Sequence, residues 1–217
     1  MRLPGAARAF VAAAFLAGRT AAEPITEHPL PAEHPCLLED ERFARLHEER
    51  GVWVGLARQA DGSAVLRARA ALAASPARVT SILADVARWP SWIRGLRTLT
   101  LLPGDPPAFA AVFAAPWPLR DRAYALLPAT ARGPASTIVF WEDGSSRLEP
   151  ASAGRVRVAP VGGCFAVTPG PAEGGATLVY TERDVFGESL PGWMRSAART
   201  RGPVRLVDGL RARLGEN

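Results

Sequence analysis

The chain has 217 residues, of which 48% are hydrophobic and 22% are charged, a composition typical of one globular domain with a substantial core. Its formal net charge is +5, every basic residue other than histidine is arginine, and Arg2, Arg8 and Arg19 stand in the first stretch. Because basic residues elsewhere alternate with acidic ones, the charge pattern excludes a massed nucleic-acid-binding surface.

Residues 1–22 have the layout of a secretory signal peptide. Arg2 and Arg8 form the charged start, residues 9–18 form a short apolar run, and residues 20–22 offer a small-residue cleavage site. This run is too short to span a membrane. We therefore expect a periplasmic or secreted protein; the alternative is an alanine-rich tail.

Residues 23–36 contain proline and histidine without periodicity, and we interpret them as a linker to one domain over residues 37–217. The two cysteines, Cys36 and Cys164, fit an exported protein with one disulfide. They fit equally well a surface thiol and a buried one, and their spacing does not decide between these.

The first elements are predicted from short local signals. Residues 37–50 carry apolar residues between charges and predict a short amphipathic helix. Two strands follow at 52–59 and 64–73, joined by a turn at Asp61-Gly62-Ser63. Ser75 is then the N-cap of a helix and Pro76 its first residue. We expect this helix to end at Trp89-Pro90 and to bury an apolar stripe, which comprises Val79, Ile82, Leu83 and Val86.

The rest of the domain alternates apolar runs with Gly, Pro and Asp clusters, which predicts seven strands in one antiparallel meander. The runs are residues 96–102, 108–115, 122–132, 136–143, 154–160, 164–169 and 176–186. Residues 189–214 then show a helical pattern that Pro203 should kink or divide. Such a sheet curls around the helix and leaves an interior cavity suited to a small molecule.

The strands carry none of the usual catalytic or metal-binding patterns. All three histidines, His28, His34 and His47, precede the strands of the sheet core, so a Ser-His-Asp site has no base there. Zinc motifs and a phosphate-binding loop are absent from the sequence. The paired carboxylates Glu142 and Asp143 are interpreted as turn or surface charges. We therefore expect no cofactor and no metal.

Three segments, "DVARWPSWIRGLRTLTLL", "APWPLRDRAY" and "SLPGWM", resemble in order and spacing the START family of StAR-related lipid-transfer domains, most of all its secreted bacterial members. The resemblance runs from about Val52 to Leu214. It implies an α+β helix-grip fold, a curved antiparallel sheet wrapped around a long C-terminal helix with an internal hydrophobic cavity. It also implies a monomeric, non-catalytic carrier or sensor of a lipid, fatty acid or sterol that contacts membranes transiently.

The resemblance also places the candidate site. It implies that Arg120 faces the cavity, while Thr98 stands where some relatives carry the acid that meets this arginine. Arg120 then binds the polar head of the ligand; the alternative is a fold-stabilising network in which Asp121 pins a turn. Trp193 and Met194 could gate entry or touch a membrane. The full set of candidate ligand-binding residues is Arg120, Thr98, Tyr124, Phe113, Phe140, Phe165, Trp193 and Met194.

Two rival functions remain open from the sequence. The first is a cyclase- or hydrolase-like enzyme of the same superfamily, which would use Arg120, Tyr124, Thr98 and Glu182 inside the cavity. The second is a scaffold whose cavity is filled by side chains. The many alanines on the strands favour an open interior over a filled one.

Overall fold

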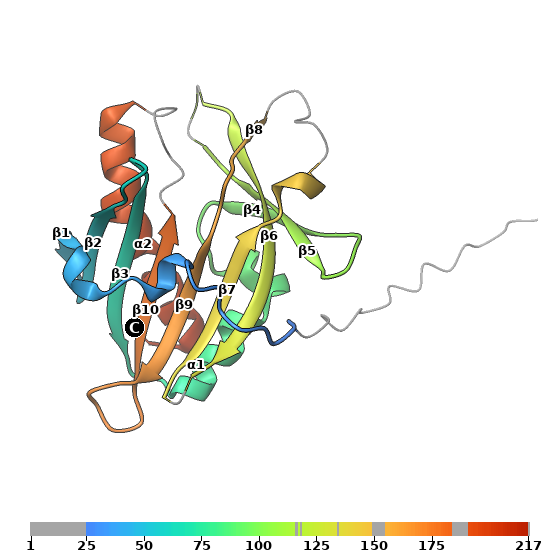
Figure 1. Cartoon of the computed structure of the whole chain (residues 1–217). Coiled ribbons are helices and arrows are strands. Elements are labelled where there is room, and N and C mark those ends of the chain that lie inside the picture. The colour runs from blue at the N-terminus through green and yellow to red at the C-terminus, as the bar shows by residue number, and fades with distance from the viewer. Residues whose placement is uncertain are drawn as a thin grey trace, which may run out of the picture.

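The computed structural model of the chain describes residues 25–115, 117, 119–133, 135–148, 155–183 and 191–216, so the expected leader lies outside it (Figure 1). Two α-helices, α1 (Pro76–Ala84) and α2 (Gly192–Leu214), accompany one large sheet. Its strands are β1 (Ala44–Glu49), β2 (Val52–Arg58), β3 (Ala64–Leu72), β4 (Leu96–Leu102), β5 (Ala108–Phe113), β6 (Asp121–Arg132), β7 (Thr137–Asp143), β8 (Arg155–Arg157), β9 (Gly163–Pro169) and β10 (Ala176–Arg183). The 3₁₀ turns are η1 (Pro35–Leu37), η2 (Asp40–Arg42), η3 (Val86–Ser91) and η4 (Ser145–Arg147).

The strand order is β1-β2-β3-β10-β9-β7-β6-β5-β4, and every neighbouring pair along it is antiparallel. The predicted antiparallel sheet is therefore confirmed. Three pairings depart from a plain meander: β3 pairs with β10, which joins the early hairpin to the last strand; β7 pairs with β9 and skips β8; and β8 runs parallel to β6. The sheet curves without closing, and α2 lies on its concave side, as a helix-grip fold requires (Figure 1).

The last part of the helix predicted after Ser75 is instead the 3₁₀ turn η3, but α1 itself begins as predicted. Ser75 is its N-cap, with its Oγ accepting a hydrogen bond from the Arg78 amide at 3.4 Å, and Pro76 is the first helical residue. The predicted hairpin is also present between β2 and β3, where Asp61 Oδ1 accepts from the Ser63 amide at 2.9 Å. The predicted stripe of α1 and η3 is buried against the sheet.

One helix prediction is wrong, and a second is wrong in part. The segment 37–50 forms two 3₁₀ turns and the edge strand β1, because its backbone completes a ladder with β2 while its charged side chains stay at the surface. The terminal helix is not divided: α2 runs without interruption through Pro203. Gly202 precedes this proline and has no Cβ for the ring to crowd, and Pro203 itself is buried.

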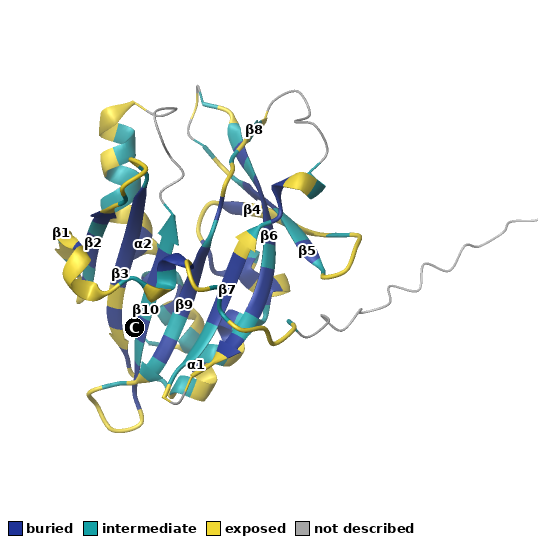
Figure 2. Ribbon diagram, in the orientation of Figure 1, coloured by how far each residue is buried: buried dark blue, intermediate teal, exposed yellow. Residues whose placement is uncertain are grey.

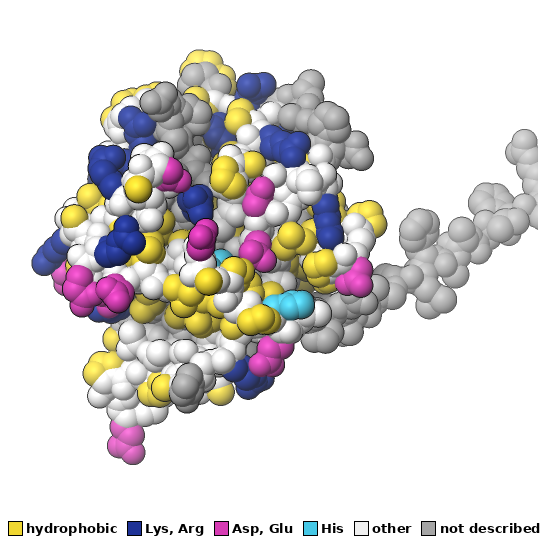
Figure 3. All heavy atoms as spheres, in the orientation of Figure 1, with side chains coloured by type: hydrophobic (Ala, Val, Ile, Leu, Met, Phe, Trp, Pro, Cys, Tyr) yellow, Lys and Arg dark blue, Asp and Glu magenta, His cyan; other side chains and the backbone are white. Residues whose placement is uncertain are grey.

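Both faces of the sheet are covered. The concave face packs against α1, η3 and α2 in the main core. The convex face carries a smaller apolar cluster beneath the N-terminal segment, the residues 25–43; its buried members are Ala129, Ala131, Phe140 and Cys164. Figure 2 shows the segment crossing β7 and β9 on this face, and Figure 3 shows hydrophobic side chains gathered in the same region. The described part of the expected linker is thus bound to the sheet.

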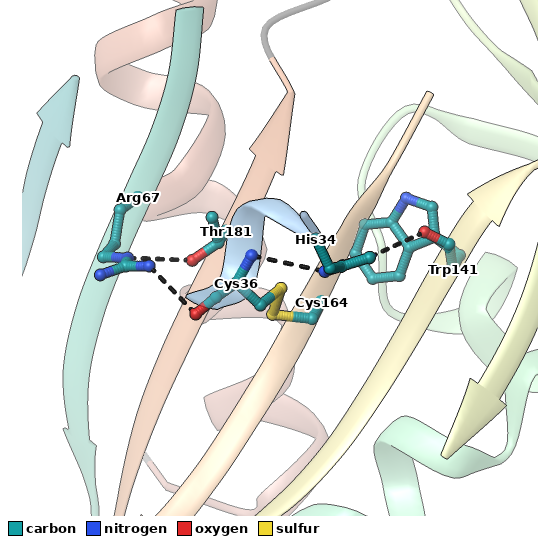
Figure 4. The surroundings of a disulfide bond; sticks show 6 residues. All are labelled: His34, Cys36, Arg67, Trp141, Cys164 and Thr181. Atoms are coloured by element: carbon teal, nitrogen blue, oxygen red, sulfur yellow. Dashed lines mark hydrogen bonds between the residues drawn. A yellow bond between two sulfur atoms is a disulfide. The ribbon is translucent and has the colours of Figure 1, made fainter. Parts of the chain in front are cut away.

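Several contacts hold the N-terminal segment on the convex face, and Figure 4 shows those around the disulfide. Cys36 and Cys164 form a disulfide, with their Cα atoms 6.2 Å apart. His34 is buried, contacts the carbonyl of Trp141 through Nε2 at 3.4 Å, and accepts from the Cys36 amide at Nδ1. Arg67 is buried on β3 and donates to Thr181 Oγ1 at 3.0 Å and to the carbonyl of Cys36. The segment is therefore tied to β3, β7, β9 and β10.

Candidate functional site

A cavity of about 580 Å³ lies between the concave face of the sheet and the N-terminal half of α2. Its volume falls within the usual range of small-molecule sites. The lining comes from Trp89, Ile93, Arg94, Gly95, Leu96, Ala111, Phe113, Ala114, Ala115, Leu119, Arg122, Tyr124, Leu126, Trp141, Val161, Gly162, Phe165, Tyr180, Glu182, Arg183, Trp193, Met194, Ala197, Ala198, Arg201, Gly202, Pro203, Arg205 and Leu206. The interior is therefore hollow, which disagrees with the filled-scaffold alternative.

Aromatic rings form one wall of the cavity. Phe165 stacks on Tyr180 with centroids 5.3 Å apart, and Trp141 tilts against Phe165 at the same separation. Trp89 meets Phe165 edge-on at 5.8 Å and is fixed by a 2.9 Å hydrogen bond from its Nε1 to the carbonyl of Leu83. Such edge and stacked pairs make a stiff apolar surface.

Gly163 makes the position of this wall possible. A Cβ at Gly163 would lie 2.6 Å from the Trp141 ring and 2.6 Å from the carbonyl oxygen of Thr181. Gly163 pairs with Trp141 across β9 and β7, so the indole lies over the glycine. Gly163 is the first residue of β9, and its missing side chain is what allows this close approach.

One region of the cavity is polar. Strand alternation on β6 turns Arg122, Tyr124 and Leu126 toward the cavity. Burial first, and then the charge of Glu182, raises the pKa of Tyr124, while Arg122 opposes this shift. Burial likewise raises the pKa of Tyr180 well above its ordinary value, and a hydrogen bond with Glu182 adds to the effect. These four side chains define the polar cluster: Arg122, Tyr124, Tyr180 and Glu182.

Arg120 is not in this cluster. Its side chain is exposed and does not line the cavity; only its carbonyl takes part, accepting from Arg122 Nη1 at 2.5 Å. The expected inward orientation is thus wrong, because β6 begins at Asp121 and Arg120 lies beyond the strand end. Asp121 Oδ1 accepts from the Ala115 amide at 3.1 Å and Oδ2 pairs with Arg97 at 3.2 Å. The alternative role of Asp121, pinning a turn, matches this geometry.

Two other candidates face away from the cavity. Thr98 is exposed because a bulge in β4 between Leu96 and Thr98 shifts the alternation. Phe140 is buried on the convex face against His34, with ring centroids 5.4 Å apart, because its neighbour Trp141 takes the cavity side.

The remaining candidates line the cavity: Phe113, Tyr124, Phe165, Trp193 and Met194. Trp193 is 73% exposed at the rim, where α2 begins. The sequence interpretation missed Arg122, Trp141 and Tyr180 as lining residues. Arg122 shares strand parity with Tyr124, and this signal could have found it.

The described residues contain no group of three or more side chains placed to hold a metal ion. Nor does any helix among them have the length and apolarity needed to cross a membrane.

No protein-family model and no curated protein matches the sequence. Solved structures do match. The STAR-related lipid transfer protein of Xanthomonas axonopodis superposes with a TM-score of 0.68 at 21% identity, over 80% of this chain and 99% of that one. Human STARD10 gives a TM-score of 0.68 at 16% identity, over 89% of this chain and 83% of its own. An aromatase/cyclase from Streptomyces gives a TM-score of 0.50 at 15% identity, over 70% of this chain and 93% of its own. The chain therefore has the helix-grip fold of StAR-related lipid-transfer domains.

Proposed function

We propose that the protein binds one hydrophobic small molecule, a lipid, fatty acid or sterol, in this cavity as a non-catalytic carrier or sensor. The observation that carries the proposal is the hollow of about 580 Å³, walled by aromatic rings and alanines and polar in one region. Each methylene that leaves water for this interior contributes about 0.8 kcal/mol to binding. The lipid-transfer name of the Xanthomonas structure supports the ligand class.

In this proposal the polar cluster holds the head group of the ligand. Arg122 takes the role expected for Arg120: its side chain is 7% exposed and borders the cavity. A buried guanidinium requires hydrogen-bonding partners, and its planar fork suits a carboxylate or phosphate. Tyr124 is protonated at neutral pH, and its raised pKa keeps its hydroxyl able to donate in alkaline solution as well, whereas the hydroxyl of Tyr180 is already hydrogen-bonded to Glu182.

The test is native mass spectrometry of the purified protein, followed by extraction and identification of whatever it carries. We expect one co-purified amphiphile per chain. Arg122→Met should lose selectivity for anionic head groups while keeping the gain in affinity per methylene, and Arg120→Met, the matched surface control, should bind as the wild type does. An empty protein that also ignores fatty acids, phospholipids and sterols would contradict the proposal.

Transfer between membranes is part of the same proposal. Trp193 and the half-buried Met194 stand at the rim, in the first turn of α2. An exposed tryptophan beside an opening is suited to a brief contact with the lipid interface. Trp193→Ala should slow ligand transfer between vesicles without weakening equilibrium binding. We further propose an exported, monomeric protein; the Cys36–Cys164 disulfide supports an oxidising compartment.

One observation favours the enzyme alternative. Tyr180 is hydrogen-bonded to the Glu182 carboxylate inside the cavity, an arrangement able to move a proton to or from a bound molecule. Two of the four residues expected for that chemistry, Arg120 and Thr98, are exposed outside the cavity. Recovery of a chemically changed ligand from the wild type, but not from Tyr180→Phe, would replace the carrier function by catalysis.

A further inference from the structure

A second hollow, of about 480 Å³, lies beside the C-terminal half of α2. It is formed by the turn between β1 and β2, the chain at the end of η3, and one side of α2. We call it the arginine hollow; its lining comprises Arg50, Ser91, Trp92, Arg94, Arg205, Asp208, Gly209, Ala212 and Arg213. It is distinct from the ligand cavity, with which it shares only Arg94 and Arg205.

The charge of the arginine hollow is strongly unbalanced. Four arginines line it against a single aspartate, and that aspartate is already paired, with Arg50 Nη1 2.5 Å from Asp208 Oδ2. The side chains of Arg94, Arg205 and Arg213 are exposed, and none of them has a hydrogen bond or ion pair within the described ranges. Like charges that border one concavity focus a positive potential into it.

The backbone holds this arrangement in a conformation that arginine does not favour. Arg50 has φ of 51° and Gly51 has φ of 68°, so both central residues of the hairpin turn are left-handed. Asn-Gly is the usual choice for such a turn, and arginine has no local reason to occupy it. Arg211 fixes the turn by donating to the carbonyl of Arg50 at 2.8 Å. Arg50 is thereby kept at the edge of the hollow.

The floor of the hollow is also tightly built. Gly209 lets α2 approach η3 closely, since a Cβ there would stand 2.2 Å from the carbonyl oxygen of Trp92. Trp92 is 6% exposed, and its indole nitrogen is a buried donor without a hydrogen-bond partner in the part of the chain that the structure describes. The indole of Trp92 packs toward Phe165 in the main core, so the donors that the hollow offers are its guanidinium groups.

We propose that the arginine hollow binds a small anion with two or more phosphate groups, a diphosphate or bisphosphate. Guanidinium groups pair with phosphate oxygens in a bidentate way, and three unpaired guanidiniums exceed what a single monoanion would satisfy. The volume of about 480 Å³ also exceeds the room that one phosphate needs. Such an anion is supplied either free in solution or as a phosphorylated lipid head group. The site does not depend on the function proposed for the main cavity.

The test is isothermal titration of the full-length protein with pyrophosphate, repeated with vesicles of phosphatidylcholine alone and with added phosphatidylinositol 4-phosphate. The variants are Arg213→Gln and Arg213→Glu. Arg213 is exposed and lines the arginine hollow but not the main cavity. The matched control, Arg78→Gln, removes the same charge from an exposed position on α1. Circular dichroism checks that each variant is folded.

We expect pyrophosphate to bind one site, about tenfold more weakly in Arg213→Gln, not detectably in Arg213→Glu, and within about twofold of wild type in Arg78→Gln. Binding to the phosphoinositide vesicles alone, with the same dependence on Arg213, supports the site and identifies a lipid head group as its ligand. Equal weakening by Arg213→Gln and Arg78→Gln would show a diffuse charge effect and overturn the proposal. So would the absence of binding to both pyrophosphate and the vesicles.

Discussion

Reducing the Cys36–Cys164 disulfide should cost the protein a large part of its stability. The bond spans 128 residues of sequence, so in the unfolded chain it closes a loop that contains most of the sheet. The loop-closure relation for that length gives about 17 cal/mol/K, or about 5 kcal/mol at 25 °C. The folded state loses little, since His34 still contacts the Trp141 carbonyl and Arg67 still donates to Asp40 and to the Cys36 carbonyl.

The assay is urea unfolding at pH 7, followed through the fluorescence of the six tryptophans, with and without reductant. With a slope of about 2 kcal/mol/M, the midpoint should fall by about 2.5 M on reduction. The double variant Cys36→Ala/Cys164→Ala should already unfold near the lower midpoint and should not respond to reductant. Coincident curves for oxidised and reduced wild-type protein would refute the argument from chain entropy.

Three further outcomes are expected. Burial lowers the pKa of His34, so below pH 6.5 the unfolded chain binds more protons than the folded protein. The free energy of unfolding should therefore decline as pH falls through the lowered pKa. In urea titrations, His34→Gln should lessen this decline, and the control His28→Gln should not. Tyr124 and Tyr180 are the only tyrosines in the sequence, and both have a raised pKa. Absorbance at 295 nm should therefore show no tyrosinate near pH 10 until the protein unfolds. The free energy of unfolding should fall as pH rises above 10, because the unfolded chain then releases protons that the folded protein keeps. Gly163→Val should lower the free energy of unfolding by about 1–3 kcal/mol, measured in urea, because its side chain meets β10 and an indole ring.

The elements that the sequence predicted correctly are those with local causes. The start of α1 depends on Ser75 and Pro76, two adjacent residues whose capping and fixed φ act within one turn. The β2–β3 hairpin depends on the short Asp61–Ser63 turn. The helix predicted over 37–50 failed because the same apolar spacing fits an edge strand, and only the partner β2 decides between them.

The candidate site was predicted only in part, because cavity orientation depends on register. On β6, the start of the strand at Asp121 leaves Arg120 outside and gives the inward position to Arg122. On β4, the bulge before Thr98 turns that residue outward. Whether Phe140 or Trp141 faces the cavity depends on which face of the sheet α2 covers. Both residues are aromatic, so their sequence does not indicate which of them lies on that face.

Because both faces of the sheet are covered, the start of a recombinant fragment matters. A chain begun at residue 37 would lack the disulfide and the buried His34, and would open Phe140 and Cys164 to solvent on an otherwise intact sheet. An exposed apolar surface along β7 and β9 favours association with other copies of the chain. We expect such a fragment to aggregate during purification, and a fragment begun at residue 25 to remain dispersed. For this protein, the part of the chain that forms the cavity and the N-terminal segment should be expressed together.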